Sequence, residues 1–313
     1  MVWFWPFLFL FSCFLCTLLT PFSITVAEGA RAIDRPDGAR KTHPRPTPRL
    51  GGLGVFLSVA LSTLFFLSPS PLLAAWLTGG ALLCALGVSD DIFSLSPRLK
   101  MTAMLFIALL PVCFGLAPRA VTLGNAVFSL PLAVSTPLTV LWLLTLTNAY
   151  NLIDGLDGLA ASQGLVSALG LSLFGGSAPP LLLAGALLGF LPYNRPALGL
   201  SAHTAKKLPT RSFLGDTGAL FIGYTLGVLS LGEAGRFSLF SPLLFALPLY
   251  ELFSSFFRRL LKGKNPFAAD GDHLHHRLLR SGLSPSPAVL LLLLYALLFA
   301  ALCLFAQAVL PLL

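Results

Sequence analysis

Long apolar stretches dominate the chain, and short polar segments separate them. A helix of roughly 20 apolar residues crosses the core of a bilayer, and ten stretches approach that length. They lie near 2–22, 51–68, 71–88, 101–117, 132–148, 159–175, 178–193, 217–232, 237–257 and 286–311. This pattern predicts an all-α polytopic membrane protein with about ten transmembrane helices in a single integral-membrane domain, residues 1–313. A weak alternation over 121–130, around Gly124 and Asn125, predicts a short β-hairpin.

Composition supports a membrane protein. Hydrophobic residues make up 56% of the chain and charged residues 10%, whereas soluble domains carry roughly a quarter of charged residues. Soluble enzymes, nucleic-acid-binding proteins and disordered scaffolds are therefore disfavoured, despite a net charge of +8. The five cysteines all lie in apolar stretches, where a thiol behaves as a small hydrophobe, and suggest no disulfide framework. The first stretch has no basic segment before it, so we expect a retained span rather than a signal peptide.

The basic residues are distributed unevenly between the two sides that ten spans would define. Only Arg119 and Arg236, of the 20 lysines and arginines, fall on one side. Because basic residues collect in cytoplasmic loops, the other side is predicted to be cytoplasmic and both termini extracytoplasmic. The predicted cytoplasmic segments are 28–50, 89–100, 149–158, 194–216 and 258–285. Nearly all acids and all five histidines lie in them too, which the charge rule does not require and which indicates chemistry on that face.

Two of these segments carry acids that are open to more than one interpretation. Asp90 and Asp91 stand side by side at the inner end of the third span. Adjacent carboxylates point about 100° apart on a helix, so one could meet a cation and the other a proton or a basic group. A solvated turn would explain the pair as simply. Asp216, between Gly215 and Thr217 at the start of the eighth span, could be a metal ligand or a helix cap.

The most specific string runs from Asn148 to Gly158 and reads Asn-Ala-Tyr-Asn-Leu-Ile-Asp-Gly-Leu-Asp-Gly. Its two acids, Asp154 and Asp157, share a helix face if the segment is helical. The glycine after each acid would let a bulky anionic ligand approach the backbone. A capping turn would explain one acid but not the repeated Asp-Gly, so the string favours a functional site.

The fourth segment combines histidines, an arginine and acids just before the last span. It contains Asp270, Asp272, His273, His275, His276 and Arg277. Histidines beside carboxylates could ligate zinc, whereas histidine and arginine together could bind a diphosphate. The acids elsewhere favour Mg²⁺, which takes oxygen ligands and is commonly shared with substrate phosphates.

Together, and in this order, the strings resemble those of the polyprenyl-phosphate N-acetylhexosamine-1-phosphate transferases, glycosyltransferase family 4. The resemblance also includes Asp34-Arg-Pro and the run from Arg40 to Gly52, and so covers nearly the whole chain. It implies an enzyme that transfers a sugar 1-phosphate from a UDP-sugar to a membrane polyprenyl phosphate and releases UMP. It also implies Mg²⁺, for which Mn²⁺ could substitute, and a multi-pass protein of the bacterial inner membrane with a cytoplasmic active site.

The His-Leu-His-His-Arg string is similar to the branch that uses UDP-GlcNAc or a similar UDP-HexNAc with undecaprenyl phosphate. That branch starts the O-antigen of lipopolysaccharide, enterobacterial common antigen or teichoic acid. For the acids, the resemblance implies that Asp216 binds Mg²⁺, that Asp90 and Asp91 meet the acceptor phosphate and its proton, and that Asp154 and Asp157 lie by the nucleotide-sugar. A homodimer is left open.

The resemblance implies contacts to the substrates for a further set of polar side chains. Lys41 and Lys100 would meet the polyprenyl phosphate, and Asn148 and Asn151 would meet the nucleotide or the metal. His273, His275, His276 and Arg277 would meet the diphosphate or the sugar.

Three positions depart from the family pattern. Many members carry a third acid where Ser94 stands, and a serine usually stands where this chain has Ala219. The segment 198–211 is longer than usual and contains Lys206 and Lys207, which suits a solvated loop or a basic patch at the membrane surface.

Other classes of protein explain the pattern less well. The peptidoglycan branch, a phospho-MurNAc-pentapeptide transferase, carries a different histidine string. A polytopic lipid or sugar transporter would have polar residues near the middle of the bilayer, whereas here they cluster in loops on one side. A CDP-alcohol phosphatidyltransferase would need acids between Asp157 and Asp216, where there are none. A membrane scaffold would not need the acids.

Overall fold

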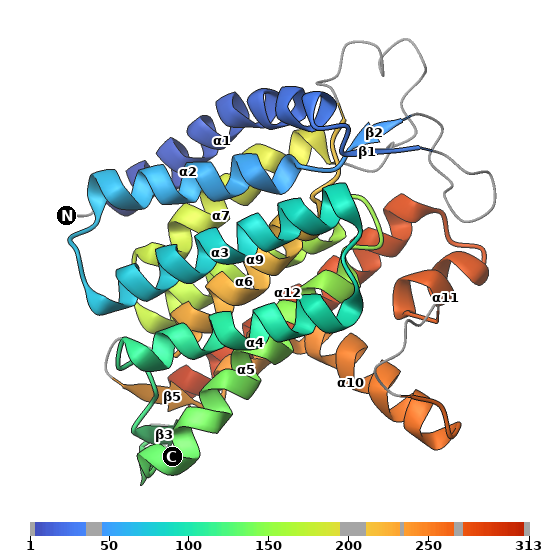
Figure 1. The fold of residues 1–313 in the computed structure, drawn as a ribbon. Helices are drawn as coiled ribbons and strands as arrows, with labels where there is room; N and C mark the ends of the chain where they lie inside the picture. The colour runs from blue at the N-terminus through green and yellow to red at the C-terminus, as the bar shows by residue number, and fades with distance from the viewer. Residues whose placement is uncertain (1–3, 36–45, 195–210, 232–234, 266–271, 310–313) are drawn as a thin grey trace.

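The computed structural model describes residues 4–35, 46–194, 211–231, 235–265 and 272–309, which form a bundle of α-helices with a small sheet at one end (Figure 1). The first helices are α1 (Phe4–Gly29), α2 (Gly51–Phe66), α3 (Pro71–Phe93), α4 (Pro97–Cys113), α5 (Leu132–Ile153), α6 (Leu159–Gly175) and α7 (Pro179–Phe190), which the 3₁₀ turn η1 (Leu191–Tyr193) extends. They are followed by α9 (Gly215–Ser230), the 3₁₀ turn η2 (Ser241–Phe245), α10 (Ala246–Leu261), α11 (Leu274–Arg280) and α12 (Pro285–Val309).

Each of the ten predicted stretches overlaps a helix, and the chain is a multi-pass membrane protein. Among the described residues, four helices are long and apolar enough to cross a bilayer by themselves, namely α1, α3, α5 and α12. Three more apolar helices, α2, α6 and α7 with η1, are shorter. The count of ten spans therefore stays a prediction.

The ninth predicted stretch, 237–257, differs most from the structure. Its first residues form the end of a short strand and the turn η2, so that α10 begins only at Ala246. The helix then leaves the bundle obliquely on the side of α11 (Figure 1). Phe253, Phe257 and Leu261 are exposed along it, and Arg258 and Arg259 lie in its last turn. α10 is thus an amphipathic helix rather than a uniformly apolar one.

Helix α9 lies at the centre of the bundle and packs against α3 and α5. Small residues allow the close approach of its neighbours. A Cβ atom at Gly87 of α3 would lie 2.7 Å from the carbonyl carbon of Asp216, and one at Gly52 of α2 would lie 2.8 Å from the carbonyl oxygen of Leu214. The start of α9 is therefore held against the start of α2 and the last turns of α3.

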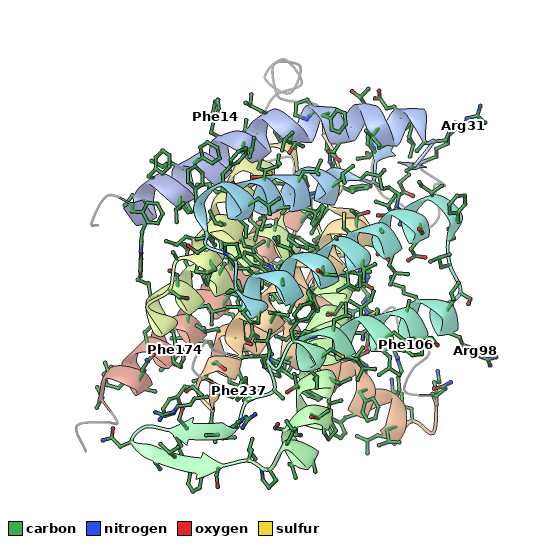
Figure 2. All side chains as sticks on the ribbon, turned by 60° about the vertical axis from the view of Figure 1, so that its left-hand side comes forward. Phe14, Arg31, Arg98, Phe106, Phe174 and Phe237 are labelled. Atoms are coloured by element: carbon green, nitrogen blue, oxygen red, sulfur yellow. The ribbon has the colours of Figure 1, made fainter. Side chains whose placement is uncertain are left out.

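The two ends of the bundle differ in character. One end carries the strands β1 (Ile33–Asp34) and β2 (Thr47–Pro48), the helix α11 and the turns between α3 and α4 and between α5 and α6. The other carries the sheet of β3 (Ala120–Leu123), β4 (Ala126–Ser129) and β5 (Arg236–Ser238). Figure 2 shows Arg31 and Arg98 projecting from the first end, with Phe174 and Phe237 towards the second.

The predicted hairpin over 121–130 is confirmed. Strands β3 and β4 are antiparallel, with Val121 opposite Phe128 and Thr122 opposite Val127. Strand β5 adds to this hairpin in parallel, beside β3. Its distance along the chain explains why a local pattern does not reveal it.

Candidate active site

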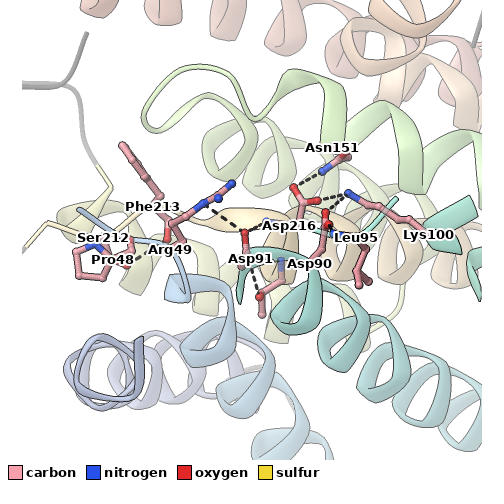
Figure 3. Close-up of polar contacts among 11 residues, drawn as sticks. Pro48, Arg49, Asp90, Asp91, Leu95, Lys100, Asn151, Ser212, Phe213 and Asp216 are labelled. Atoms are coloured by element: carbon pink, nitrogen blue, oxygen red, sulfur yellow. Dashed lines mark hydrogen bonds and ion pairs between the residues drawn. The ribbon is translucent and has the colours of Figure 1, made fainter. Parts of the chain in front are cut away.

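Four polar side chains from four helices meet at the end of the bundle that carries α11. The ammonium group of Lys100 lies 3.0 Å from Oδ2 of Asp90 and also pairs with Asp216. The amide of Asn151 donates to Oδ1 of Asp216 at 2.8 Å. Figure 3 shows these contacts at the ends of α3, α4, α5 and α9. The structure thus unites three of the strings that the sequence analysis singled out.

The turn between α3 and α4 places Lys100 opposite Asp90. Helix α3 ends at Ser94, which has a left-handed φ of 53° and donates its N–H to the carbonyl of Asp90. The carboxylate of Asp90 accepts the N–H of Leu95 at 2.7 Å. Ser96 then caps α4 through the N–H of Leu99. Ser94 therefore serves as the helix C-cap at the position where many family members carry an acid.

Asp91 caps the start of α9. Its Oδ1 accepts the N–H of Asp216 at 3.2 Å, and its Oδ2 accepts the N–H of Thr217 at 3.1 Å and the hydroxyl of Thr217 at 2.8 Å. Gly215 has a φ of 71°, and a Cβ atom there would lie 2.6 Å from Asp91 Oδ2. Arg49 lies 3.6 Å from the same fully buried carboxylate. Asp91 thus positions Asp216, and Asp90 is the more accessible acid of the pair.

The string from 154 to 158 forms a turn between α5 and α6. Gly158, with a φ of 78°, is the N-cap residue of α6, so the two acids of the string do not share a helix face as a helical segment would require. Asp154 follows the last residue of α5, and Asp157 pairs with Arg211. The condition of the expectation, a helical segment, is therefore not met, because the chain turns at Gly158, where glycine tolerates the positive φ.

Asn194 ties this turn to the segment before α9. Its side-chain oxygen accepts the N–H of Gly158 at 2.9 Å, and its amide donates to the carbonyl of Ser212 at 3.0 Å. Neither Asn194 nor Arg211 was predicted from the sequence to belong to the site. The sequence distinguishes Asn194 only as a polar residue at the end of an apolar stretch.

Asp154 belongs to the same electrostatic environment as the acid cluster. Burial raises its pKa well above the ordinary value of an aspartate, and the charges of Asp216 and Asp91 raise it further. Arg49 opposes these effects. A carboxyl group that resists ionisation in this way would ionise more easily beside a bound cation.

The histidine string reaches the other side of this turn. His275 is 1% exposed, and a Cβ atom on Gly155 would lie 2.8 Å from its Cε1 and closer still to its Nε2. The ring of His276 lies 4.3 Å from that of His275. Burial, followed by the nearby His276 and His273, lowers the pKa of His275 to about 3, so the ring is neutral near pH 7.

Other sequence-predicted residues lie apart from the acid cluster. Arg277 pairs with Asp272 at 3.2 Å, and Arg280 also pairs with Asp272. Asn148 donates to the carbonyl of Leu144 at 2.9 Å on a partly exposed side of α5. Lys41 lies outside the described residues, as do Asp270 and all of the long 198–211 segment except Arg211. Ala219 packs in the hydrophobic core.

The donor set at Asp216 suits a hard cation. Within the described ranges, no three His, Cys, Asp or Glu side chains lie close enough together to enclose a metal ion. Mg²⁺, however, commonly uses one or two carboxylates and completes its shell with water and substrate phosphates. Asp90, Asp216 and the Asn151 amide oxygen are such donors, and the Lys100 ammonium group between the two acids marks a position that already attracts a positive charge. These residues fit Mg²⁺.

Comparisons with known proteins show the family of the chain. Residues 73–233 match the family model described as glycosyl transferase family 4. A probable undecaprenyl-phosphate N-acetylglucosaminyl 1-phosphate transferase of Bacillus subtilis is 33% identical over 93% of this chain and 82% of its own length. A decaprenyl-phosphate N-acetylglucosaminephosphotransferase of Mycobacterium tuberculosis is 34% identical over 82% of this chain and 71% of its own. An undecaprenyl-phosphate alpha-N-acetylglucosaminyl 1-phosphate transferase of Escherichia coli is 29% identical over 94% and 80%.

Proposed function

Because the chain belongs to glycosyl transferase family 4, we propose that it transfers GlcNAc-1-phosphate from UDP-GlcNAc to a polyprenyl phosphate and releases UMP. The names of the relatives from three bacteria support this donor and acceptor. The observation that carries the proposal is the meeting of Asp90, Asp216, Asn151 and Lys100 at one end of the bundle. A lipid or sugar transporter would instead distribute its polar groups near the middle of the membrane.

The proposed reaction is a displacement at phosphorus. An oxygen of the polyprenyl phosphate attacks the β-phosphorus of UDP-GlcNAc, the bond from that phosphorus to the bridging oxygen breaks, and UMP leaves with the bridging oxygen. Asp90, the more accessible acid of its pair, is proposed to take up the proton of the acceptor phosphate. Lys100 would reduce the repulsion between the two anionic substrates.

Asp216 and Asn151 would hold Mg²⁺. When bound, this ion would supply positive charge to the phosphate oxygens in the transition state. Asp91 would keep Asp216 in place through the first turn of α9. Asp154 and Asp157, together with the histidines across the turn, would then line the side on which the nucleotide-sugar binds.

The site is proposed to face the cytoplasm of a bacterial inner membrane. The basic residues next to β1 and on α4 support this orientation, and Figure 2 shows two of them, Arg31 and Arg98, at the end of the bundle that carries the acid cluster. In this arrangement the chain crosses the membrane ten times, and both termini are extracytoplasmic. The proposed acceptor in this membrane is undecaprenyl phosphate. The product would be the first lipid-linked intermediate of an envelope polysaccharide.

Release of UMP tests the proposal. Membranes that contain the protein should release UMP from UDP-GlcNAc only when undecaprenyl phosphate and Mg²⁺ are both present. Asp216→Asn should abolish the release, whereas Glu28→Gln, which neutralises an exposed acid of α1, should not. UDP-MurNAc-pentapeptide should not replace UDP-GlcNAc. UMP release without the acceptor, or an unchanged rate in Asp216→Asn, would contradict the proposal.

A further inference from the structure

Glu251 of α10 is a buried acid that the proposed reaction does not use. The residue is 2% exposed, and its Oε1 accepts the backbone N–H of Leu274 at 2.6 Å. Its other oxygen, Oε2, is buried and makes no hydrogen bond with the described residues. A carboxylate in such surroundings is costly unless its oxygens meet donors. The groups that face Oε2 therefore decide what Glu251 does.

Two histidines present their Nδ1 atoms to Glu251. Nδ1 of His273 lies 3.4 Å from Oε2, and Nδ1 of His275 lies 4.0 Å from Oε1, and neither Nδ1 atom makes a hydrogen bond with the described residues. Both rings are buried and nearly parallel, with centroids 5.5 Å apart and an interplanar angle of 11°. Because an ionised carboxylate can only accept hydrogen bonds, each nitrogen that faces it is favoured as an N–H donor.

The opposite edge of His275 faces the turn that carries Asp154. Its Nε2 is the atom nearest to the Cβ position of Gly155, and it makes no hydrogen bond with the described residues. A buried polar atom without a partner, aimed at the turn between α5 and α6, is available to a ligand. Glu251, His275 and this turn thus form a continuous series from α10 to the candidate active site.

We propose that Glu251 is a positioning residue that holds the protons of His273 and His275 on Nδ1 and so leaves Nε2 of His275 unprotonated against the Asp154–Gly155 turn. The partner of one ring nitrogen sets the state of the other, and the partner here is the charge of the Glu251 carboxylate at ion-pair distance. With a ring that is neutral near pH 7, this tautomer makes Nε2 an acceptor. On the proposed function, on which this step rests, it accepts a hydrogen bond from a hydroxyl group of the sugar nucleotide and not from a phosphate oxygen, which has no proton to donate.

The position of the ring proton can be measured without substrate. Protein labelled with ¹⁵N-histidine, purified in detergent, should give ¹⁵N NMR signals of the Nδ1–H form for both rings, assigned with the His273→Gln and His275→Gln variants. Glu251→Gln keeps the side-chain size and an oxygen for the Leu274 N–H, and its amide nitrogen then takes the position of Oε2, which faces Nδ1 of His273. The His273 proton should move to Nε2. Because the negative charge is lost, the Nδ1–H form of His275 should also lose population to the Nε2–H form.

Matched variants separate this role from simple support of α11. Glu251→Asp keeps the carboxylate and should retain the Nδ1–H form, and Tyr250→Phe, a change at the neighbouring and largely exposed residue, should match the wild type. A wild-type signal with the proton on Nε2 would overturn the inference even if Glu251→Gln fails to fold. Unchanged tautomers of both His273 and His275 in a folded Glu251→Gln protein would overturn it as well.

Kinetics supply the second readout. Loss of one buried hydrogen bond to the substrate should raise the KM for UDP-GlcNAc about 3- to 10-fold in Glu251→Gln, with a smaller change in kcat and partial recovery in Glu251→Asp. A fall in kcat with an unchanged KM would contradict the assigned acceptor role.

If the tautomers are as stated but no UMP is released, the proposed function fails and the role of Glu251 in holding the rings stands. If UMP is released and the tautomer does not depend on Glu251, only this inference fails.

Discussion

Replacing Gly155 by alanine would test whether the histidine string and the turn at Asp154 form one site. The new Cβ atom would lie 2.8 Å from Cε1 of His275 and closer to Nε2, whereas ordinary contacts begin near 3.4 Å. The backbone of Gly155 does not have a positive φ, so alanine is not excluded by conformation. The perturbation is therefore mainly steric, and it falls on one buried ring.

The expected size of the effect follows from this crowding. His275 is 1% exposed, so its ring cannot swing into solvent and must move by roughly 1 Å within a packed region. Overpacking of this kind costs about 1–3 kcal/mol of stability, and a displacement of about 1 Å at a reacting centre can lower the rate roughly 10²-fold. We therefore expect kcat/KM to fall roughly 10²-fold, with a modest loss of stability.

The assay is UMP release from UDP-GlcNAc in membranes, with thermal unfolding in detergent as the measure of stability. Gly29→Ala is the matched control, because a Cβ atom at Gly29 would have nothing within 4 Å. It should leave both quantities close to those of the wild type. If Gly155→Ala keeps a kcat/KM within two-fold of the wild type, the contact between His275 and the turn has no part in the reaction.

Three further outcomes follow from the cluster. Lys100→Met removes the ammonium group between Asp90 and Asp216. With EDTA present, its free energy of unfolding should fall by about 1–3 kcal/mol, less than for a fully buried ion pair because these side chains are partly exposed. Mg²⁺ should raise its Tm more than that of the wild type. The folded-state pKa of His275 is about 3 against an ordinary 6.5, so the ring stabilises the fold above pH 6.5 and loses that contribution as the pH falls towards 3. As the pH falls through this window, the wild type should therefore lose stability relative to His275→Gln, by on the order of a few kcal/mol. Thermal unfolding of both proteins at a series of pH values measures this difference. Asp91→Asn should lower the unfolding free energy by about 1–3 kcal/mol, because it weakens the cap of α9.

The sequence pattern predicts most of the helices because a membrane span must satisfy its backbone hydrogen bonds internally and so needs a long apolar stretch. The same reasoning fails over 237–257. The stretch is apolar in composition, but its first residues pair with β3, and the remainder becomes the amphipathic α10. Strand pairing between segments far apart in the chain leaves no local signal.

The candidate site was predictable where several chemical groups share a short string. Asp90, Asp216 and Asn151 stand in such strings, and they meet in the structure. The capping role of Asp91 could not be predicted, since it depends on where the start of α9 lies relative to α3. Glu251 likewise stands alone in an apolar stretch, and only the packing of α11 brings histidines to it.

The most direct test of the account uses UDP-GlcNAc labelled with ³²P in its β-phosphate and with ¹⁴C in its sugar. If the acid cluster transfers a sugar 1-phosphate, both labels should enter the polyprenyl lipid in equal amounts with Mg²⁺ present, and neither should enter it with EDTA or in Asp216→Asn. Lipid that carries ¹⁴C without ³²P would show transfer of the sugar alone and would contradict the account, as would a lipid product formed equally well by Asp216→Asn.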